Sequence, residues 1–289
     1  MDFALNDRRR RSGGTATRLI AAVGLRRFAA GYAGPLVRLR RTSDNAERDF
    51  SAGAGMWLDE AAVLAWCGAA SAYASVLYGQ AGGFDFSQAT ASAQPRLVNA
   101  GVMETMAGRP ALRFSGAQWL AGPVSSAGLT SLGIFCVARI DADGLNDCGM
   151  WGWALGTGTR LYMSRFFSTT ANGNAGDVSF ATDGSLAVAL RPRVSAQGPY
   201  PNPEAGPQAW EFHVGPTSRA GRRNGVSVTE SAGLNGPPYT GADTMLLGRL
   251  SLTSGSIFEG WLGDMVVLGN GGDADVAGFG AALRPAWGV

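Results

Sequence analysis

Residues 31–41 read Gly-Tyr-Ala-Gly-Pro-Leu-Val-Arg-Leu-Arg-Arg, and this stretch indicates the fold class. Apolar and basic residues alternate from Pro35 to Arg40, which predicts a β-strand with one face on a core and the other in solvent. Residues 132–140 are apolar enough to form a strand that is buried along most of its length. The other predicted strands are residues 111–114, 177–181, 187–190, 209–214, 227–230, 245–249 and 260–268.

The segments between these runs favour an all-β chain with few short helices. Asn224-Gly225 predicts a two-residue hairpin, because both residues tolerate a positive φ. The 43 glycines and 13 prolines are scattered, as expected for short strands joined by tight turns. A chain of 289 residues can bury a large core, and a β-sandwich of this length can be one domain. Helices are predicted only for residues 17–28, 58–66 and 275–283.

Several short runs also follow one another in an informative order. They are Leu25-Arg26-Arg27-Phe28, the stretch 31–41, Ser43-Asp44-Asn45, residues 77–82 (Leu-Tyr-Gly-Gln-Ala-Gly), 93–98 (Ala-Gln-Pro-Arg-Leu-Val), 108–116 (Gly-Arg-Pro-Ala-Leu-Arg-Phe-Ser-Gly) and 258–268 (Phe-Glu-Gly-Trp-Leu-Gly-Asp-Met-Val-Val-Leu). This succession resembles the catalytic domain of the fungal-type α-L-arabinofuranosidase B family and its concanavalin A-like, laminin-G-like relatives in phage tail and spike proteins. The resemblance implies a concanavalin A-like jelly-roll β-sandwich over residues 19–289 that handles carbohydrate.

Positive charge is concentrated at the N-terminus. All 24 basic residues are arginine, and eleven of them lie in residues 1–48 against four acids. Residues 1–18 contain the run Arg8, Arg9, Arg10 and Arg11, which predicts either a solvated tail or an arm that anchors the chain in a partner protein. Nucleic-acid binding is disfavoured because no aromatic residues interleave the run. The apolar run 19–25 is far shorter than the ~20 residues that span a bilayer, so no membrane insertion is expected.

Cysteine and histidine offer little chemistry. The three cysteines, Cys67, Cys136 and Cys148, form no metal-binding spacing and are predicted to be free thiols. His213 is the only histidine and lies in an alternating run, where a structural role is favoured. The sequence therefore predicts no metal site and no cofactor.

The resemblance also implies where catalytic carboxylates would lie if the chain were a retaining glycosidase, which needs two of them about 5 Å apart. The family's nucleophile is a glutamate of the central strands, but no glutamate occurs between Glu104 and Glu204, so Asp177 or Asp183 would replace it. Its acid/base is an aspartate after the penultimate strand, where Asp273 and Asp275 lie. An aspartate there can instead cap the terminal helix, and capping is the favoured interpretation.

Other family features are also incomplete. The family's Tyr-Asp-Gln-Ser-Gly turn is present as residues 78–82 without its acid, and its adjacent cysteine pair is reduced to Cys148 alone. These departures favour sugar binding without hydrolysis. The expected binding residues are aromatic side chains that stack on sugar rings and polar groups that bind hydroxyls. They are Trp151, Trp153, Asn146, Asp147, Tyr162 and Tyr78. The alternative, that Trp151 and Trp153 fill the core, is equally compatible with the sequence.

The main functional hypothesis is a non-catalytic carbohydrate-binding spike or fibre component of a phage or phage-like particle, assembled in the bacterial cytoplasm. Its expected partners are virion proteins, bound through the arm, and host surface polysaccharide. The first alternative is an arabinofuranosidase-like glycoside hydrolase, and the second is a structural virion decoration protein that binds no glycan. The sequence leaves open whether the chain forms a homo-oligomer.

Overall fold

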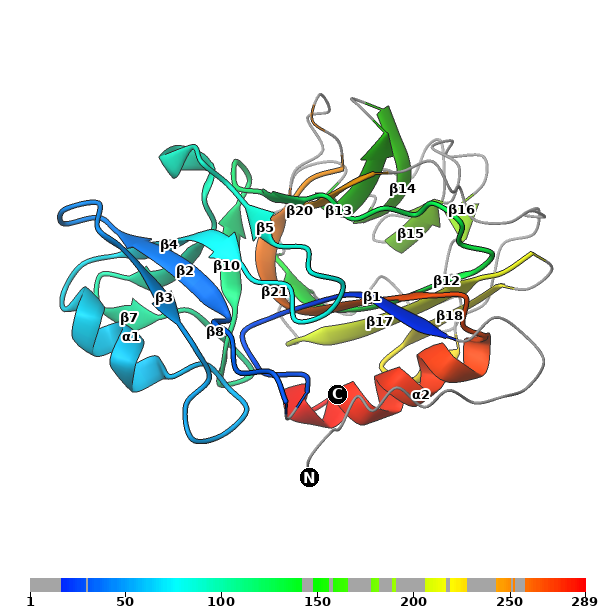
Figure 1. Ribbon diagram of the computed structural model, residues 1–289, viewed down its shortest axis with the longest axis horizontal. Helices are drawn as coiled ribbons and strands as arrows, with labels where there is room; N and C mark the ends of the chain where they lie inside the picture. The colour runs from blue at the N-terminus through cyan, green and yellow to red at the C-terminus, as the bar shows by residue number, and fades with distance from the viewer. Residues whose placement is uncertain are drawn as a thin grey trace.

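Antiparallel strands dominate the computed structural model (Figure 1). It describes residues 17–29, 31–141, 148–155, 158–165, 178–181, 189–190, 206–216, 219–227, 243–250, 252 and 258–289. Over these residues the chain forms a β-sandwich with two α-helices, so the predicted all-β class is confirmed. No helix in this part of the chain is long and apolar enough to cross a membrane.

Two layers of strands make up the sandwich. The lower layer in Figure 1 is ordered β1 (Arg18–Val23), β21 (Glu259–Gly269), β12 (Leu132–Ile140), β17 (Gln208–Val214), β18 (Arg219–Arg223) and β19 (Val226–Ser227). The upper layer is ordered β5 (Phe86–Ser87), β11 (Leu120–Gly122), β20 (Thr244–Leu247), β13 (Cys148–Leu155), β14 (Gly158–Arg165), β15 (Val178–Ala181) and β16 (Ala189–Leu190).

A third group of strands joins the two layers. These strands are β2 (Val37–Arg41), β3 (Glu47–Phe50), β4 (Ala72–Leu77), β6 (Arg96–Asn99), β7 (Val102–Met103) and β10 (Leu112–Ser115). Strand β4 pairs with β5 of the upper layer, and β10 pairs with β21 of the lower layer. A separate small hairpin is formed by β8 (Thr105–Met106) and β9 (Arg109–Pro110), and a short helical turn, η1, spans Ala91–Ala93.

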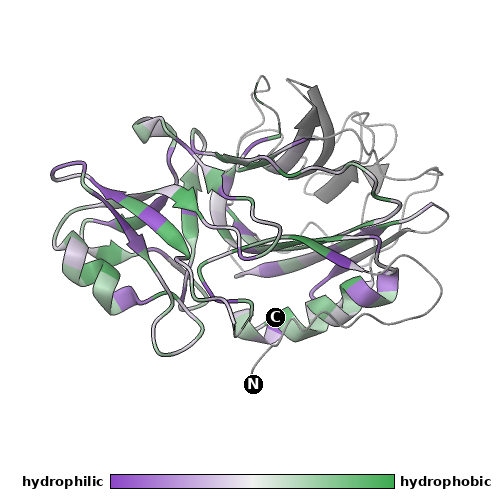
Figure 2. Cartoon of the chain, in the orientation of Figure 1, coloured by the Kyte–Doolittle hydropathy of each residue, from purple (hydrophilic) through white to green (hydrophobic). Residues whose placement is uncertain are grey.

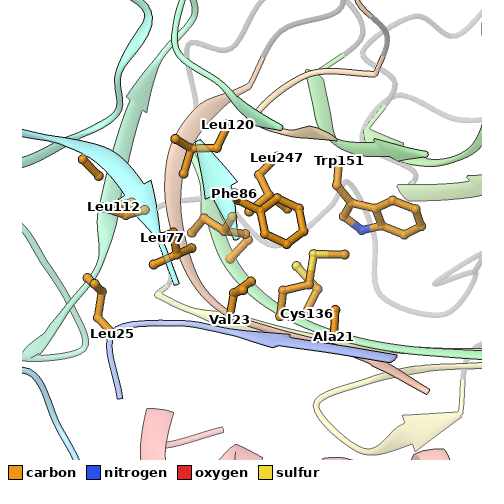
Figure 3. Close-up of a cluster of buried hydrophobic side chains, with 14 of the residues drawn as sticks. Ala21, Val23, Leu25, Leu77, Phe86, Leu112, Leu120, Cys136, Trp151 and Leu247 are labelled. Carbon is orange, nitrogen blue, oxygen red and sulfur yellow. The ribbon is translucent and has the colours of Figure 1, made fainter. Parts of the chain in front are cut away.

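The main core lies between the layers (Figure 3). Ala21 and Cys136 contribute to it from the lower layer, and Phe86, Trp151 and Leu247 from the upper layer. Helix α1 (Glu60–Cys67) adds Val63 and Cys67, and Asp59 caps its first turn by accepting the Ala62 N–H at 3.0 Å. Cys67 and Cys136 are free and buried, as predicted.

A second core lies on the outer face of the lower layer. Helix α2 (Asp273–Leu283) covers this face and continues into the short helix η4 (Arg284–Trp287). Val276 and Leu283 of α2 pack with Phe135, Val137 and Leu268 of the sheet. Figure 2 shows that the N-terminal end of α2 is hydrophilic, and this end carries Asp273 and Asp275.

The helix predicted over residues 17–28 is wrong, because Arg18–Val23 form the strand β1. Its residues pair with β21 in a register that runs from Arg18 opposite Gly269 to Val23 opposite Met265. Ile20 and Val23 are β-branched and suit a strand, and pairing with β21 outweighs the helix preference of the alanines between them. The predicted strand over residues 132–140, the Asn224-Gly225 hairpin and the helices near residues 60 and 275 are confirmed.

Candidate functional site

The paired tryptophans do not form an exposed platform for sugar. Trp151 and Trp153 point to the same side of β13, as their spacing predicts, but both are fully buried in the main core. The Trp153 indole N–H donates to the Val124 carbonyl at 2.6 Å, which satisfies its only polar atom. Figure 3 shows the Trp151 ring in the space between the layers, near Leu247. The structure therefore corrects the binding interpretation, and the alternative of core packing holds for both residues.

The glycine between the two tryptophans lies on the opposite side of β13, which is also covered. A Cβ on Gly152 would overlap the Leu250 carbonyl oxygen, so the chain that follows β20 covers the outer side of β13 at this point. Both sides of the strand are thus covered. Tyr162 pairs with Gly152 across β13 and β14, and its side chain lies outside the described part of the chain, as do Asn146 and Asp147.

Tyr78 lies in a part-exposed polar cluster, and it is the one predicted sugar-binding residue that the structure describes outside the core. Its hydroxyl donates to Asp49 Oδ1 at 2.8 Å. The Arg38 guanidinium donates to both oxygens of the same carboxylate, at 2.7 and 3.0 Å. Pairing of β2 with β3 and β4 positions these groups, because Arg38 lies opposite Asp49 on one side and Val76 on the other. We call Arg38, Asp49 and Tyr78 the Tyr78 cluster.

The electrostatics of this cluster fix its protonation states at neutral pH. The hydrogen bond from Arg38 lowers the pKa of Asp49, so its carboxylate is ionised. Burial, the hydrogen bond to Asp49 and its charge raise the pKa of Tyr78 to about 12, so the phenol keeps its proton. The nearby Asp85 accepts the Gly79 N–H at 3.0 Å. A carboxylate, a phenol and a guanidinium together offer acceptors and donors of the kind that bind sugar hydroxyls.

Asp273 and Asp275, the candidate acid/base residues, both make structural hydrogen bonds at the start of α2. Asp275 accepts the backbone N–H of Gly272 at 2.8 Å and the Thr17 hydroxyl at 2.8 Å, so the predicted capping role is confirmed. Asp273 accepts two hydrogen bonds from the Arg222 guanidinium, and this contact lowers the pKa of its carboxyl. Both residues lie on the helix that covers the outer face of the lower layer. Asp177 and Asp183, and the arm residues Arg8, Arg9, Arg10 and Arg11, lie outside the residues that the structure describes.

His213 is buried beneath α2, in agreement with its predicted structural role. Its Nε2 lies 3.2 Å from the Gly271 carbonyl oxygen. On the same side of β17, Glu211 is fully buried and pairs with Arg284. Among the described residues no group of three or more His, Cys, Asp or Glu side chains could hold a metal ion.

One further buried polar group, formed by Arg26, Asp264 and Trp287, was not predicted from the sequence. Arg26 Nε donates to Asp264 Oδ2 at 2.6 Å, and the Trp287 indole N–H donates to the same oxygen at 2.8 Å. Both charged side chains are almost fully excluded from solvent. The predicted strand over residues 260–268 is mostly apolar, which indicates core packing. The aspartate within it, Asp264, is the one sign in the sequence that a buried charged partner is needed.

The comparisons with known proteins agree on architecture. No protein-family model matches the chain, and no curated protein matches it. The chain is similar in structure to a GH54 α-L-arabinofuranosidase soaked with a cyclic sulfate inhibitor, with a TM-score of 0.65 and 18% identity over 94% of this chain and 63% of that one. An arabinofuranosidase complexed with arabinofuranosyl-α-1,2-xylobiose matches with a TM-score of 0.65 and 17% identity over the same shares. The chain thus spans less than two thirds of the length of these enzymes, and identity this low shows a shared fold.

Proposed function

We propose that this chain is a carbohydrate-active domain and that its activity is glycoside hydrolysis of the arabinofuranosidase type. The observation that supports this proposal is the likeness to two arabinofuranosidase structures over 94% of the chain. The ordered sequence runs from residues 25 to 116 resemble the same family, which is an independent argument. Fold alone does not define activity, so the chemistry has to be tested at named residues.

The proposal narrows the choice of catalytic residues. A retaining glycosidase needs one carboxylate as nucleophile and a second as acid/base, about 5 Å apart. The Asp273 carboxylate accepts a hydrogen bond from Arg222, and the Asp275 carboxylate accepts from Gly272 and Thr17. Asp177 and Asp183 are then the remaining candidates of the four, and we propose them as the residues to substitute first.

Hydrolysis of 4-nitrophenyl α-L-arabinofuranoside by the full chain tests this proposal directly. We expect release of nitrophenol above the uncatalysed rate. This release should be lost in whichever of Asp177→Asn and Asp183→Asn removes the nucleophilic carboxylate, because the glycosyl-enzyme intermediate can then no longer form. Asp243→Asn is a matched control, because Asp243 is exposed and bonded only to its neighbour Thr244 among the described residues. Absence of hydrolysis by the unmodified chain on arabinofuranosides and xylan-derived oligosaccharides would rule the enzyme out.

A binding-only domain is the second candidate, favoured by the structural use of Asp273 and Asp275 and by the part-exposed Tyr78 cluster. In this form the chain would be a spike or fibre component of a phage-like particle, with residues 1–18 as its anchoring arm. Tyr78→Ala should then weaken glycan binding in a titration while the melting temperature stays within a few degrees of the unmodified chain. Unchanged binding would remove the Tyr78 cluster as the contact.

A further inference from the structure

The turn between β21 and α2 is a joint at which several distant segments meet. The Gly271 carbonyl oxygen accepts from the Ser131 hydroxyl at 2.7 Å and lies 3.2 Å from His213 Nε2. Asn270 adopts a positive φ of 60°, and its side chain accepts the Thr130 N–H at 2.8 Å. The turn therefore depends on side chains from β17 and from the residues that precede β12.

The first described residues of the chain are fixed at the same place. The Thr17 hydroxyl donates to Asp275 Oδ2, the oxygen that also accepts the Gly272 N–H. Thr17 immediately precedes β1. The start of the N-terminal strand and the start of the C-terminal helix are thus held by one carboxylate oxygen.

His213 is the titratable group at the centre of this joint. A carbonyl oxygen can only accept, so the contact with Gly271 requires the proton of a neutral imidazole to be on Nε2. Nδ1 is then unprotonated, and it is buried with no hydrogen-bond partner among the residues that the structure describes. A second proton would have to enter at Nδ1, in a site that offers it no acceptor.

The charged groups around His213 lie on α2, β17, β18 and η4. Asp273 and Asp275 of α2 favour its protonated form, and Arg222 of β18 opposes it. Glu211 lies two residues away on β17 and is paired with Arg284 of η4. Burial lowers the pKa of His213, and it outweighs the two aspartates and the hydrogen bond to the Gly271 carbonyl, which raise it. Burial also raises the pKa of Glu211.

We propose that His213 makes this turn sensitive to acid. Protonation of His213 loosens the Asn270–Asp273 turn, and with it the attachment of α2 and of the Thr17 end of β1. A charged imidazolium with an unpaired N–H in a dry site is unfavourable, and the site relieves this by opening toward water. Opening there frees the hydrophilic end of α2 first, because Val276 and Leu283 hold the rest of the helix on the sheet.

The sign of the pH dependence follows from the direction of the shift. Because the folded-state pKa of His213 is lowered, the unfolded or opened form binds its proton first. The stabilisation is complete above pH 6.5 and is lost as the pH falls from there toward the folded-state pKa. Asp273 has a lowered pKa as well and loses its contribution only below its ordinary value of 3.8, so the two groups act in separate pH ranges. Glu211 acts with the opposite sign, because its raised pKa makes ionisation costly.

Hydrogen exchange of the α2 amides in the full chain tests this proposal, with His213→Gln as the decisive variant. The glutamine side-chain amide can donate to Gly271 as Nε2 does, but it does not titrate. After correction for intrinsic exchange, protection of residues 270–283 in the unmodified chain should fall by up to about tenfold per pH unit below pH 6.5, the limit for one proton. In His213→Gln this fall should be absent above pH 4.5.

Two outcomes would overturn the proposed role of His213. One is an equal loss of protection in both chains, which would assign the effect to the carboxylates. The other is full protection of α2 in the unmodified chain down to pH 4. The imidazole resonance provides a measurement that needs no variant, because the chain has a single histidine. A midpoint at or above 6.5 in the folded state would also contradict the proposal.

Discussion

The buried pair of Arg26 and Asp264 allows a quantitative test of how this fold is held together. Asp264→Asn keeps the shape of the side chain and an oxygen that can accept from Trp287, but it removes the negative charge. Arg26 is almost fully buried and would be left as an uncompensated cation. Removing one partner of a buried pair costs about 3–5 kcal/mol, and we expect this loss in the free energy of unfolding. Burial already raises the pKa of Asp264 despite Arg26, which shows how strongly the site is desolvated.

A double variant separates the cost of the unpaired charge from the cost of lost packing. Arg26→Met in the Asp264→Asn background removes the orphaned guanidinium and keeps an unbranched side chain against Phe28 and Trp57, which Arg26 contacts in the native structure. The double variant should therefore be more stable than Asp264→Asn alone. Non-additivity of roughly 2 kcal/mol is within the range for residues in direct contact.

Urea unfolding followed by tryptophan fluorescence measures both variants. With a slope of about 3 kcal/mol per molar urea, a loss of 3–5 kcal/mol lowers the midpoint by roughly 1–1.7 M. A loss below 1 kcal/mol for Asp264→Asn, or strictly additive effects in the double variant, would refute the argument that a desolvated charge pair joins β21 to the segment after β1.

Three further predictions concern single residues. Trp153→Ala should lower the free energy of unfolding by about 3–5 kcal/mol, because the whole ring is buried. A change below about 1 kcal/mol in urea unfolding would contradict the burial of the ring. Ala107→Gly should raise the stability by up to about 1 kcal/mol, since Ala107 has a φ of 50°, and a lower melting temperature would contradict this. The ultraviolet difference titration between the unmodified chain and Tyr78→Phe should show a phenol with a midpoint near 12. The contribution of Tyr78 to the stability of the folded chain is then complete below pH 10 and is lost as the pH rises through 12. A midpoint near 10 would show that the bond to Asp49 is absent.

Local patterns predicted those elements whose burial depends on their own sequence. The strand over residues 132–140 is apolar throughout, and Asn224-Gly225 requires only two positive φ values. The strand β1 was missed because its alanines suit either structure, and its choice is made by β21 from the other end of the chain. A local pattern cannot contain that information.

The candidate site was predicted less well, for a related reason. The spacing of Trp151 and Trp153 gave the correct common side, but whether that side is exposed depends on Phe86 and Leu247 from other strands. Tyr78 was identified by its motif alone. Its partners Asp49 and Arg38 lie 29 and 40 residues earlier and reach it only through pairing of β2, β3 and β4.

The position of β21 affects how the chain can fold during synthesis. Although it comes late in the chain, β21 is an interior strand of the lower layer and pairs with β1, β10 and β12. Until it leaves the ribosome, these three strands expose unpaired backbone edges, which favour association between nascent chains. Contacts such as Arg18 with Gly269 connect opposite ends of the chain, so folding should be slow. Removal of the chain from Glu259 onward would take an interior strand out of the sheet, whereas chain ends usually tolerate truncation.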